Sequence, residues 1–287
     1  MNISTTRRNF LGAAGAAGFA AAFPTSASAK IEQTPWGIKL GLATYTFRNF
    51  DRAKTIEFIK AVQTPWVSVK QEGVKGKFHW DMKAPAEEQA KAKQDFAAAG
   101  LKVMSAGNTD MKALTADGLR PLFLWAKAAG IPMLVAAPVH DNIGVIEGLI
   151  KEYDIKVAIH NHGPEDKNFP TPQSVLDVVK NMDPRMGLCI DCGHTSRTGV
   201  DVVESIRVAG PRLHSMHVKD LADAKVKESQ CDVGDGVLPM VAIFKQLHRM
   251  NYTGGVMLEY EINESDPMLG MQKSLAYMRG VMAGLRG

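Results

Sequence analysis

Four apolar segments in the second half of the chain each end in a side chain that can bind a metal ion. These ends are His160, Asp191, His217 and Glu259. Imidazole and carboxylate donors together suit Mn²⁺, Zn²⁺, Co²⁺ or Fe²⁺ better than Mg²⁺ or Ca²⁺. A single histidine in such a place is usually an ordinary loop residue. Four such ends in succession predict one site for a divalent cation, with these residues as its ligands.

The alternation of side chains along a strand narrows the choice within each segment. His160 and His162 are two residues apart and are predicted to share a face, with Asn161 on the opposite face. Glu259 and Glu261 also share a face, so spacing alone does not separate them. Because Glu259 is nearer the apolar segment, we take it as the ligand and expect Glu261 to form a salt bridge at the rim.

A second group of polar residues near these segments is expected to contact a substrate. His194 lies three residues after Asp191 and is predicted to exchange protons with the substrate, to bind a hydroxyl group, or only to support the ligands. Together with Glu259 and His160 it makes up the predicted catalytic set. The predicted substrate-binding residues are His162, Lys219, Lys70 and His140. The alternative for Lys219 is an ion pair with Asp220.

Three loop features on the same predicted face are weaker candidates. Glu72 and His79 follow the second strand-like segment and are candidates for substrate contact. The segment Gly234-Asp235-Gly236 can approach a site closely, but it lacks the G-x-G-x-x-G spacing of a phosphate-binding turn.

Eight strand-like segments alternate with eight helical patterns. Most of the strand-like segments are continuously apolar, as strands of a parallel sheet buried on both faces must be. They cover residues 39–46, 66–71, 102–106, 133–137, 156–161, 186–191, 213–218 and 255–260. The helical patterns cover residues 53–62, 84–99, 116–129, 143–153, 171–181, 201–209, 238–250 and 267–283.

This alternation predicts an α/β protein that forms a single (β/α)₈ TIM barrel. Eight such units in a chain of this length favour a closed barrel over an open sheet. In such barrels the catalytic groups lie at the carboxyl ends of the strands. The strand-end residues His160, Asp191, His217 and Glu259 should therefore meet at one end of the barrel.

The first 29 residues are interpreted as a twin-arginine signal peptide. Arg7-Arg8 precedes a weakly apolar run, which is followed by Pro24 and the small residues Ala27-Ser28-Ala29. The run is too short for the ~20 residues that span a bilayer, and the alternative is an Ala-rich tail. Cleavage after Ala29 would leave residues 30–287 as one barrel domain located in the periplasm, with no membrane span.

Charge and cysteine content argue against other classes of protein. The formal charge is +4 and falls to +2 when Arg7 and Arg8 are removed with the signal. No run of Lys and Arg indicates nucleic-acid binding. Three cysteines do not suggest a disulfide framework, and Cys189 and Cys192 are interpreted as small buried hydrophobic residues rather than a redox pair. The sequence leaves the oligomeric state open and is compatible with a homo-oligomer.

At these residues the sequence resembles the xylose isomerase-like barrel superfamily of sugar phosphate isomerases and epimerases. The resemblance covers nearly the whole mature chain and is most specific around residues 187–194, 213–220 and 254–261. It implies that Asp191, His217 and Glu259 bind a divalent metal, usually Mn²⁺. Where the family has a fourth ligand, a glutamate, this chain has His160. Since the two glutamates of the family act as an acid–base pair, a one-base reaction is expected.

The resemblance implies an enzyme that removes the proton next to a sugar carbonyl through a metal-stabilised enolate. The first hypothesis is an isomerase or epimerase that acts on a small sugar. The alternative is a lyase or hydratase that cleaves 3-keto-glycosides by β-elimination, which shares the same enolate. A non-catalytic periplasmic sugar-binding barrel is a further alternative. A DNA-repair endonuclease of the same superfamily is disfavoured by the nearly neutral charge.

Overall fold

The computed structural model describes residues 37–71 and 79–285. The predicted signal peptide, its cleavage site after Ala29 and the candidate Glu72 therefore lie outside the described residues.

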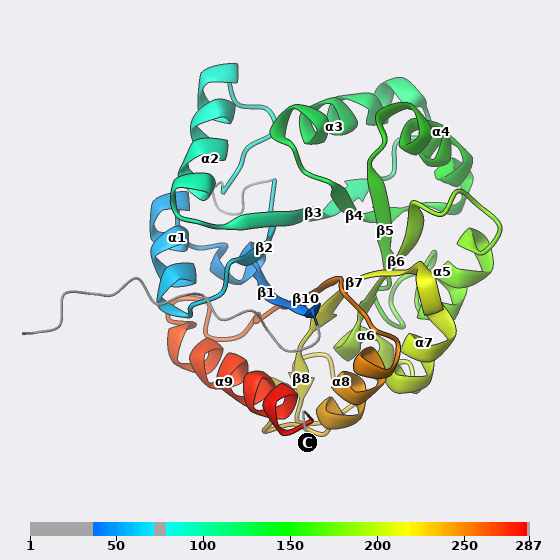
Figure 1. Cartoon of the computed structure of the whole chain (residues 1–287). Helices are drawn as coiled ribbons and strands as arrows, with labels where there is room; N and C mark the ends of the chain where they lie inside the picture. Colours follow the sequence, from blue (N-terminus) through cyan, green and yellow to red (C-terminus); the bar gives the residue numbers. More distant parts are fainter. Residues whose placement is uncertain (1–36, 72–78, 286–287) are drawn as a thin grey trace, which may run out of the picture. The chain divides into compact units, whose positions relative to one another are not determined.

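Eight parallel strands form a closed barrel, as predicted (Figure 1). Their order around the barrel is β1-β10-β7-β6-β5-β4-β3-β2. Read in the opposite direction around the closed ring, this is the order of the strands along the chain. They are β1 Lys39–Ala43, β2 Trp66–Val69, β3 Lys102–Met111, β4 Met133–Pro138, β5 Lys156–His160, β6 Met186–Asp191, β7 Leu213–Val218 and β10 Gly255–Leu258. The strands that carry the predicted ligands are therefore consecutive neighbours: β5, β6, β7 and β10.

Helices surround this ring of strands (Figure 1). They are α1 Arg52–Ala61, α2 Ala86–Ala98, α3 Ala116–Ala129, α4 Ile143–Tyr153, α5 Pro172–Val179, α7 Val202–Ala209, α8 Met240–Arg249 and α9 Met268–Gly284. Local chemistry sets several of their ends. The Thr171 side chain accepts a hydrogen bond from the backbone N–H of Ser174, and Pro172 occupies the first turn of α5. Gly130 ends α3 with a φ of 77°.

The structure also contains elements that the apolar pattern did not predict. A short helix, α6 (Cys192–Arg197), follows β6 directly, and a small antiparallel ribbon pairs β8 (Asp220–Leu221) with β9 (Gln230–Cys231). Short 3-10 turns cover Thr44–Phe47, His140–Asn142 and Gly210–Arg212. These segments are too short or too polar to show a period, which is why the sequence did not reveal them.

Two strand ends differ from the prediction for identifiable reasons. β1 ends at Ala43 instead of Thr46, because the chain turns there and the hydroxyl groups of Thr44 and Thr46 accept hydrogen bonds from the backbone of Lys70 and Tyr260. β3 continues to Met111, past the predicted end at 106, after a register shift against β4.

The hydrophobic core has two parts, one on each face of the barrel wall. The larger cluster joins the outward side chains of the strands to the helices. The smaller cluster consists of Met133, Val135, Ala158 and Cys189. These residues alternate with members of the larger cluster along β4, β5 and β6, so they face the barrel interior. Among the described residues, every helix is too short or too polar to cross a bilayer.

Gly187 allows β6 to run unusually close to the chain before β7. A Cβ atom at this position would lie 2.3 Å from the carbonyl oxygen of Arg212. The register between β6 and β7 shifts at the next residues along β6, and a backbone atom cannot move aside as a flexible side chain can.

We therefore expect Gly187→Ala to destabilise the barrel by about 1–3 kcal/mol, because the added methyl group overpacks the wall. For a domain of this size, this corresponds to a melting temperature lower by roughly 2–4 °C for each kcal/mol. The matched control is Gly148→Ala in α4, where a Cβ meets nothing within 4 Å; it should leave stability unchanged or raise it by up to about 1 kcal/mol. Equal melting temperatures for both variants would contradict this account of Gly187.

Candidate metal centre

The four residues predicted as ligands meet at the carboxyl ends of four neighbouring strands. His160 and Asp191 are the last residues of β5 and β6, and Asp191 is paired in register with His217 of β7. Glu259 directly follows β10. One ligand atom of each residue lies within 4.8 Å of the others. All four residues are buried, with 7% exposure at most.

The separations between these atoms fit one cation. Nε2 of His160 lies 3.1 Å from Nδ1 of His217 and 3.5 Å from Oδ2 of Asp191. Nδ1 of His217 lies 3.4 Å from Oε1 of Glu259. Ligand atoms about 2.1 Å from a divalent ion are about 3 Å apart when they are neighbours in an octahedral shell. Small movements of the side chains would bring these atoms around a single ion.

In each of the two ligand carboxylates, Asp191 and Glu259, one oxygen binds another protein group and the other lies next to a ligand histidine. Oδ1 of Asp191 accepts a hydrogen bond of 2.8 Å from the backbone N–H of His194 and so caps α6. Oδ2 of Asp191 is buried and accepts no hydrogen bond among the described residues. A buried carboxylate oxygen without a hydrogen bond is costly unless a cation is close, and here the ammonium group of Lys219, 3.2 Å away, supplies part of that charge. The donor set and this oxygen fit a divalent metal ion.

The ammonium group of Lys219 lies beside the same cluster. Its Nζ is 3.2 Å from Oδ2 of Asp191 and 2.9 Å from Oε2 of Glu259, and it also pairs with Glu261. Burial lowers the pKa of Lys219, but the three carboxylates outweigh burial and hold it well above its ordinary value. Burial raises the pKa of Asp191 and of Glu259, and Lys219 reverses this effect, so both lie well below their ordinary values.

The charges of this cluster do not balance without a further cation. Three carboxylates and one ammonium leave a net charge of −2 with neutral imidazoles, and −1 when His217 is protonated. Burial lowers the pKa of His217, but Cys189 and Glu259 outweigh burial and raise it well above its ordinary value, so a cation bound here would take the place of that proton. Burial, together with the neighbouring His162, holds the pKa of His160 well below its ordinary value. Neutral imidazole is the form that binds a metal. A divalent cation would neutralise the cluster.

The suggested pairing of Lys219 with Asp220 is wrong. The carboxylate of Asp220 is buried and accepts backbone hydrogen bonds from Leu221, Gly234, Gly236 and Leu238. A Cβ at Gly236 would lie 2.2 Å from Oδ1 of Asp220. The glycines of the Gly234-Asp235-Gly236 segment therefore let the backbone fold around Asp220. This packing accounts for the two glycines without a role in substrate binding.

Two further histidines adjoin the cluster and are partly exposed. The ring of His194 lies 5.8 Å from that of His160, and the ring of His162 lies 4.4 Å from it, centroid to centroid. Nη1 of Arg197 lies 3.1 Å from Nδ1 of His194. Because a guanidinium can only donate, Nδ1 must accept, and a neutral His194 carries its proton on Nε2. Burial lowers the pKa of His194 to about 4, which favours this neutral form.

Lys70 and His162 are linked through a residue that the sequence did not indicate. Nδ2 of Asn108 donates to Nε2 of His162 over 2.6 Å, and Nζ of Lys70 donates to the carbonyl oxygen of Asn108 over 2.5 Å. Nδ1 of His162 lies 3.4 Å from a carboxylate oxygen of Asp166. The chain Lys70–Asn108–His162 thus runs from β2 and β3 to the edge of the ligand cluster.

Two other candidate residues have their side-chain contacts with residues outside the ligand cluster. Nε2 of His140 contacts the carbonyl oxygen of Asn168, and its ring packs against Phe169 at the exposed rim. His79 is buried, contacts Thr44 and Phe47 through its two ring nitrogens, and has its pKa lowered to about 4 by burial. A substrate role for His79 is therefore wrong, because both of its nitrogens are used within the fold.

The important residues missed by the sequence analysis are Arg197 and Asn108. Neither falls at the end of an apolar segment, and each acts through a contact with a histidine on another turn or strand. Arg197 is three residues after His194 in α6, so the i, i+3 spacing of a helix was the one available signal.

Cys189 offers an alternative ligand. It is buried as predicted, and its sulfur lies within 4.8 Å of ligand atoms of both His160 and His217. A set with a thiolate would favour Zn²⁺, whereas the set with two carboxylates also suits Mn²⁺. Asp191 and Glu259 supply donors that need no loss of a thiol proton, so we take the carboxylate set as the candidate site.

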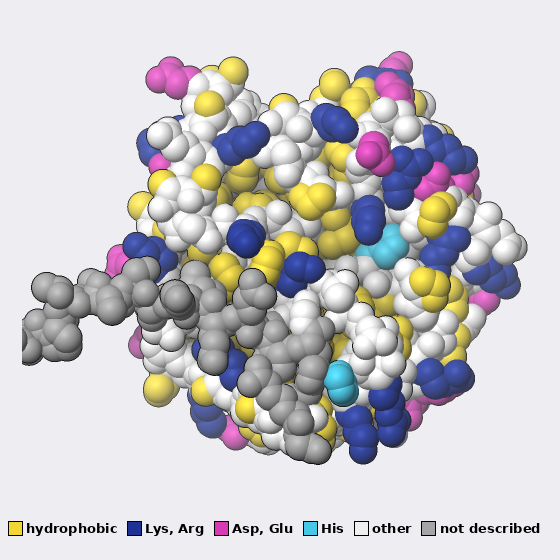
Figure 2. Space-filling model, in the orientation of Figure 1, with side chains coloured by type: hydrophobic (Ala, Val, Ile, Leu, Met, Phe, Trp, Pro, Cys, Tyr) yellow, Lys and Arg dark blue, Asp and Glu magenta, His cyan; other side chains and the backbone are white. Residues whose placement is uncertain are grey.

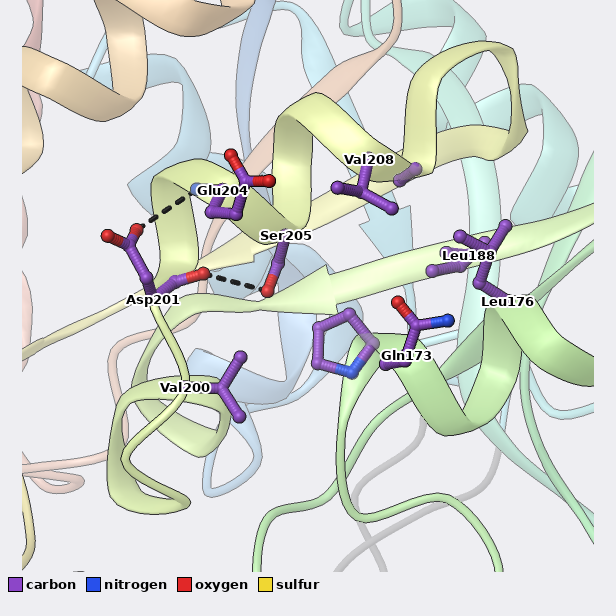
Figure 3. A pocket seen from close by; sticks show the side chains of 10 residues that line it. Gln173, Leu176, Leu188, Val200, Asp201, Glu204, Ser205 and Val208 are labelled. Atoms are coloured by element: carbon purple, nitrogen blue, oxygen red, sulfur yellow. Dashed lines mark hydrogen bonds between the residues drawn. The ribbon is translucent and has the colours of Figure 1, made fainter.

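In the part of the chain that the structure describes, the two hollows discussed next lack such a cluster. Figure 2 shows one face on which hydrophobic and Lys or Arg side chains border a central hollow. A cavity of about 990 Å³ is lined by residues at the amino ends of strands, including Lys39, Lys156 and His214. Another, of about 120 Å³, lies between α5 and α7, and there Asp201 caps α7 by accepting from the backbone of Glu204 (Figure 3).

Comparisons with known proteins agree with this architecture. The model of the family described as xylose isomerase-like TIM barrel matches residues 110–281. The chain is 23% identical over 153 residues to an inosose dehydratase of Mesomycoplasma hyopneumoniae, across 46% of this chain and 50% of that protein. It is 26% identical over 137 residues to an inosose dehydratase of Clostridium perfringens, across 42% and 46%. The chain thus spans about half the length of these curated relatives.

Solved structures share the fold at low sequence identity. A D-psicose 3-epimerase from Clostridium cellulolyticum superposes with a TM-score of 0.66 at 15% identity, covering 85% of this chain and 99% of the epimerase. A protein from Parabacteroides distasonis superposes with a TM-score of 0.66 at 24% identity, covering 85% and 99%. At these identities the structures support the fold alone.

We predict that Asp191→Asn lowers the affinity for a divalent cation by roughly 100-fold or more, because it removes a charged ligand while keeping an oxygen to cap α6. Metal content after dialysis and titration calorimetry with Mn²⁺ and Zn²⁺ measure this loss. His140→Gln at the rim is the control and should keep full metal content. Cys189→Ser separates the two ligand sets: loss of metal in this variant, with retention in Asp191→Asn, would contradict the carboxylate set.

Proposed function

The chain belongs to the xylose isomerase-like TIM barrel family, and from this premise we propose that it is a metal-dependent enzyme that removes a proton next to the ketone carbonyl of a sugar or related cyclic polyol. We further propose that it expels a group from the adjoining carbon. The observation that carries this proposal is the asymmetric ligand cluster, in which ligand atoms of His160 and Glu259, at the ends of the first and last of four neighbouring strands, lie within 4.8 Å of each other.

His160, Asp191, His217 and Glu259 would hold the cation. When bound there, a divalent metal ion supplies Lewis-acid polarisation of a carbonyl oxygen, which acidifies the neighbouring C–H bond. The mixed imidazole and carboxylate donors favour Mn²⁺, with Zn²⁺, Co²⁺ or Fe²⁺ as alternatives.

Glu259 is the proposed base. Its carboxylate is buried next to Lys219 and has a pKa well below its ordinary value, because Lys219 outweighs the opposing effect of burial. It therefore stays ionised and is able to accept the proton from the carbon. The same ammonium lies within reach of oxygen atoms of a substrate that enters the cluster, which is the proposed binding role of Lys219.

His194 is the proposed acid. Arg197 directs the proton of the neutral imidazole to Nε2, away from the guanidinium. As Glu259 takes the proton from carbon, the electron pair of that C–H bond forms the new C=C bond. The C–O bond at the adjoining carbon breaks, and the leaving oxygen receives the proton of His194. The balance is loss of water or an alcohol from a ketone, with no oxidant or reductant required.

The asymmetry favours elimination over epimerisation. An epimerase that removes and returns a proton on opposite faces needs a base on each side of the carbon. Here one side carries a carboxylate and the other carries His160, whose pKa is lowered by burial. The names of the curated relatives point the same way, since a dehydratase removes water and an inosose carries a ketone.

An isomerase or epimerase acting on a small keto-sugar is the second candidate. It is favoured by the contact between His160 and His217, because an imidazole that stays partly free of the cation is able to return a proton. A non-catalytic sugar-binding barrel would use the same pocket without turnover. Proton exchange and product analysis separate these three candidates.

We expect the metal-loaded protein in D₂O to act on 3-keto-glycosides by releasing the C1 substituent and forming an enone, which ¹H NMR follows directly. Glu259→Gln should lower the rate by about 10²–10⁴-fold, because it removes the general base. Deuterium at the α carbon without release of the substituent would show that the chain is an isomerase or epimerase. Absence of both exchange and release with any keto-sugar would support the binding protein.

In the same assay, His194→Gln should lose release of the substituent by about 10²-fold or more while still exchanging the α proton, because it removes only the acid. The control is His140→Gln. Equal loss of exchange and release in His194→Gln would show that His194 does not act on the leaving oxygen.

We also propose that the protein is exported to the periplasm by the twin-arginine pathway. In this case, the protein recovered from the periplasm should begin at Lys30. Replacing both Arg7 and Arg8 by lysine keeps the charge but should retain the uncleaved chain in the cytoplasm, as shown by fractionation and N-terminal sequencing. Unchanged export of this double variant would rule out the twin-arginine route.

A further inference from the structure

A cavity of about 310 Å³ adjoins the ligand cluster on the same face of the barrel. It lies among α6, the β8–β9 ribbon and the segment after β10. Its lining residues are Gly193, His194, Arg197, Lys219, Leu221, Lys227, Glu228, Gln230, Glu261 and Ile262. The four proposed metal ligands are not among them. The volume is near the lower end of the roughly 300–1,000 Å³ of small-molecule sites, so it has room for about one sugar ring.

The cavity and the cluster share a wall. Lys219 and Glu261 line the cavity, and Nζ of Lys219 contacts the ligands Asp191 and Glu259. His194 also lines the cavity, and its ring lies 5.8 Å from the ring of His160. A molecule that reacts at the cluster can therefore extend past His194 and Lys219 into the cavity.

The buried cations of the cavity are already neutralised by protein groups. Lys219 is paired with three carboxylates, and Arg197 is paired with Glu165. Lys227 is exposed, forms no ion pair among the described residues, and stands beside Glu228 in the lining. A phosphate or carboxylate in this cavity would therefore find one exposed ammonium group, next to a carboxylate of the same lining. The balance favours an uncharged occupant.

The remaining groups suit a polyhydroxylated ring. Nδ1 of His194 accepts from Arg197, so the neutral ring carries its N–H at Nε2. Because His194 lines the cavity, this N–H is a donor for an oxygen atom of a ligand there. Leu221 and Ile262 supply apolar surface for the C–H face of a ring. Hydroxyl groups and C–H faces occur together in an uncharged sugar.

We infer that this cavity holds an uncharged sugar ring joined through an oxygen atom to the carbon from which the proposed reaction expels its group. The substrate is then a keto-glycoside at least the size of a disaccharide, and neither a free monosaccharide nor a sugar phosphate. This inference rests on the proposed function for the position of the linking oxygen, which lies at His194 between the cluster and the cavity.

The kinetic test compares two substrates with the metal-loaded full-length enzyme. One is a 3-keto-disaccharide with a glucosyl leaving group, and the other is the corresponding methyl 3-keto-glycoside. The wild type should have a kcat/KM at least about 10-fold higher for the disaccharide, because its second ring fills the cavity. Ile262→Trp should abolish this preference, mainly through KM, and should leave the methyl glycoside within about 3-fold of wild type.

Two other variants make this comparison specific. Glu228→Trp fills the cavity from an exposed lining residue and should act in the same way if Ile262→Trp disturbs folding. Val226→Trp lies in the same loop, is 43% exposed in the wild type and does not line the cavity, so it should keep the preference. An unchanged preference in both cavity variants would overturn the inference while elimination of the methyl glycoside still supports the proposed function.

A binding experiment tests which ligand the cavity prefers without requiring turnover of a substrate. Calorimetric titrations of the metal-loaded protein with trehalose, glucose and glucose 6-phosphate should show trehalose binding at least about 10-fold more tightly than glucose, and no gain from the phosphate. Glu228→Trp should remove the advantage of trehalose. Tighter binding of the phosphate, or equal binding of trehalose and glucose, would overturn the inference even if no keto-sugar is turned over.

Discussion

The site depends on the burial of two carboxylates, with a third at their edge, beside one ammonium group. Lys219 contacts Asp191, Glu259 and Glu261 from a side chain that is only 5% exposed. Charges removed from water in this way are stable only when partners are close and well placed. Gly193 makes this possible, since a Cβ there would lie 2.7 Å from Cγ of Lys219. The lysine stem therefore runs along the start of α6, and its head group reaches the ligands from the side.

The same burial separates the roles of the histidines. His160 and His217 are almost fully buried among the carboxylates; burial lowers the pKa of His160, whereas Cys189 and Glu259 outweigh burial at His217 and raise its pKa. His162 and His194 adjoin them at the opening, and each is oriented by another residue: Asn108 for His162 and Arg197 for His194. One cluster of four imidazoles thus contains two donors for a cation and two groups suited to contact a substrate. A barrel with a second glutamate in place of His160 would be more symmetric and more acidic.

The segments outside the barrel wall give the site its second compartment. Asp220 accepts four backbone hydrogen bonds and fixes the chain that returns from the β8–β9 ribbon. Gln230 of β9 donates to the carbonyl oxygen of Glu259 and accepts from the backbone N–H of Glu261, so the ribbon also holds the segment after β10. These contacts tie the ligand Glu259 and the neighbouring cavity to one framework.

The sequence by itself determined the barrel and indicated which four strand-end residues would meet. The bounds of β6, β7, α3 and α4 match the predicted ranges, because continuous apolar segments and helical periodicity are local patterns. Parallel strands of a closed barrel all end on one side, so residues at strand ends must meet there. Only the tertiary structure decided that Lys219 pairs with three carboxylates instead of Asp220, that Arg197 orients His194, and that His79 and His140 have their side-chain contacts outside the cluster. These contacts join loops of different strands, and their partners follow from packing in space rather than from any period along the chain.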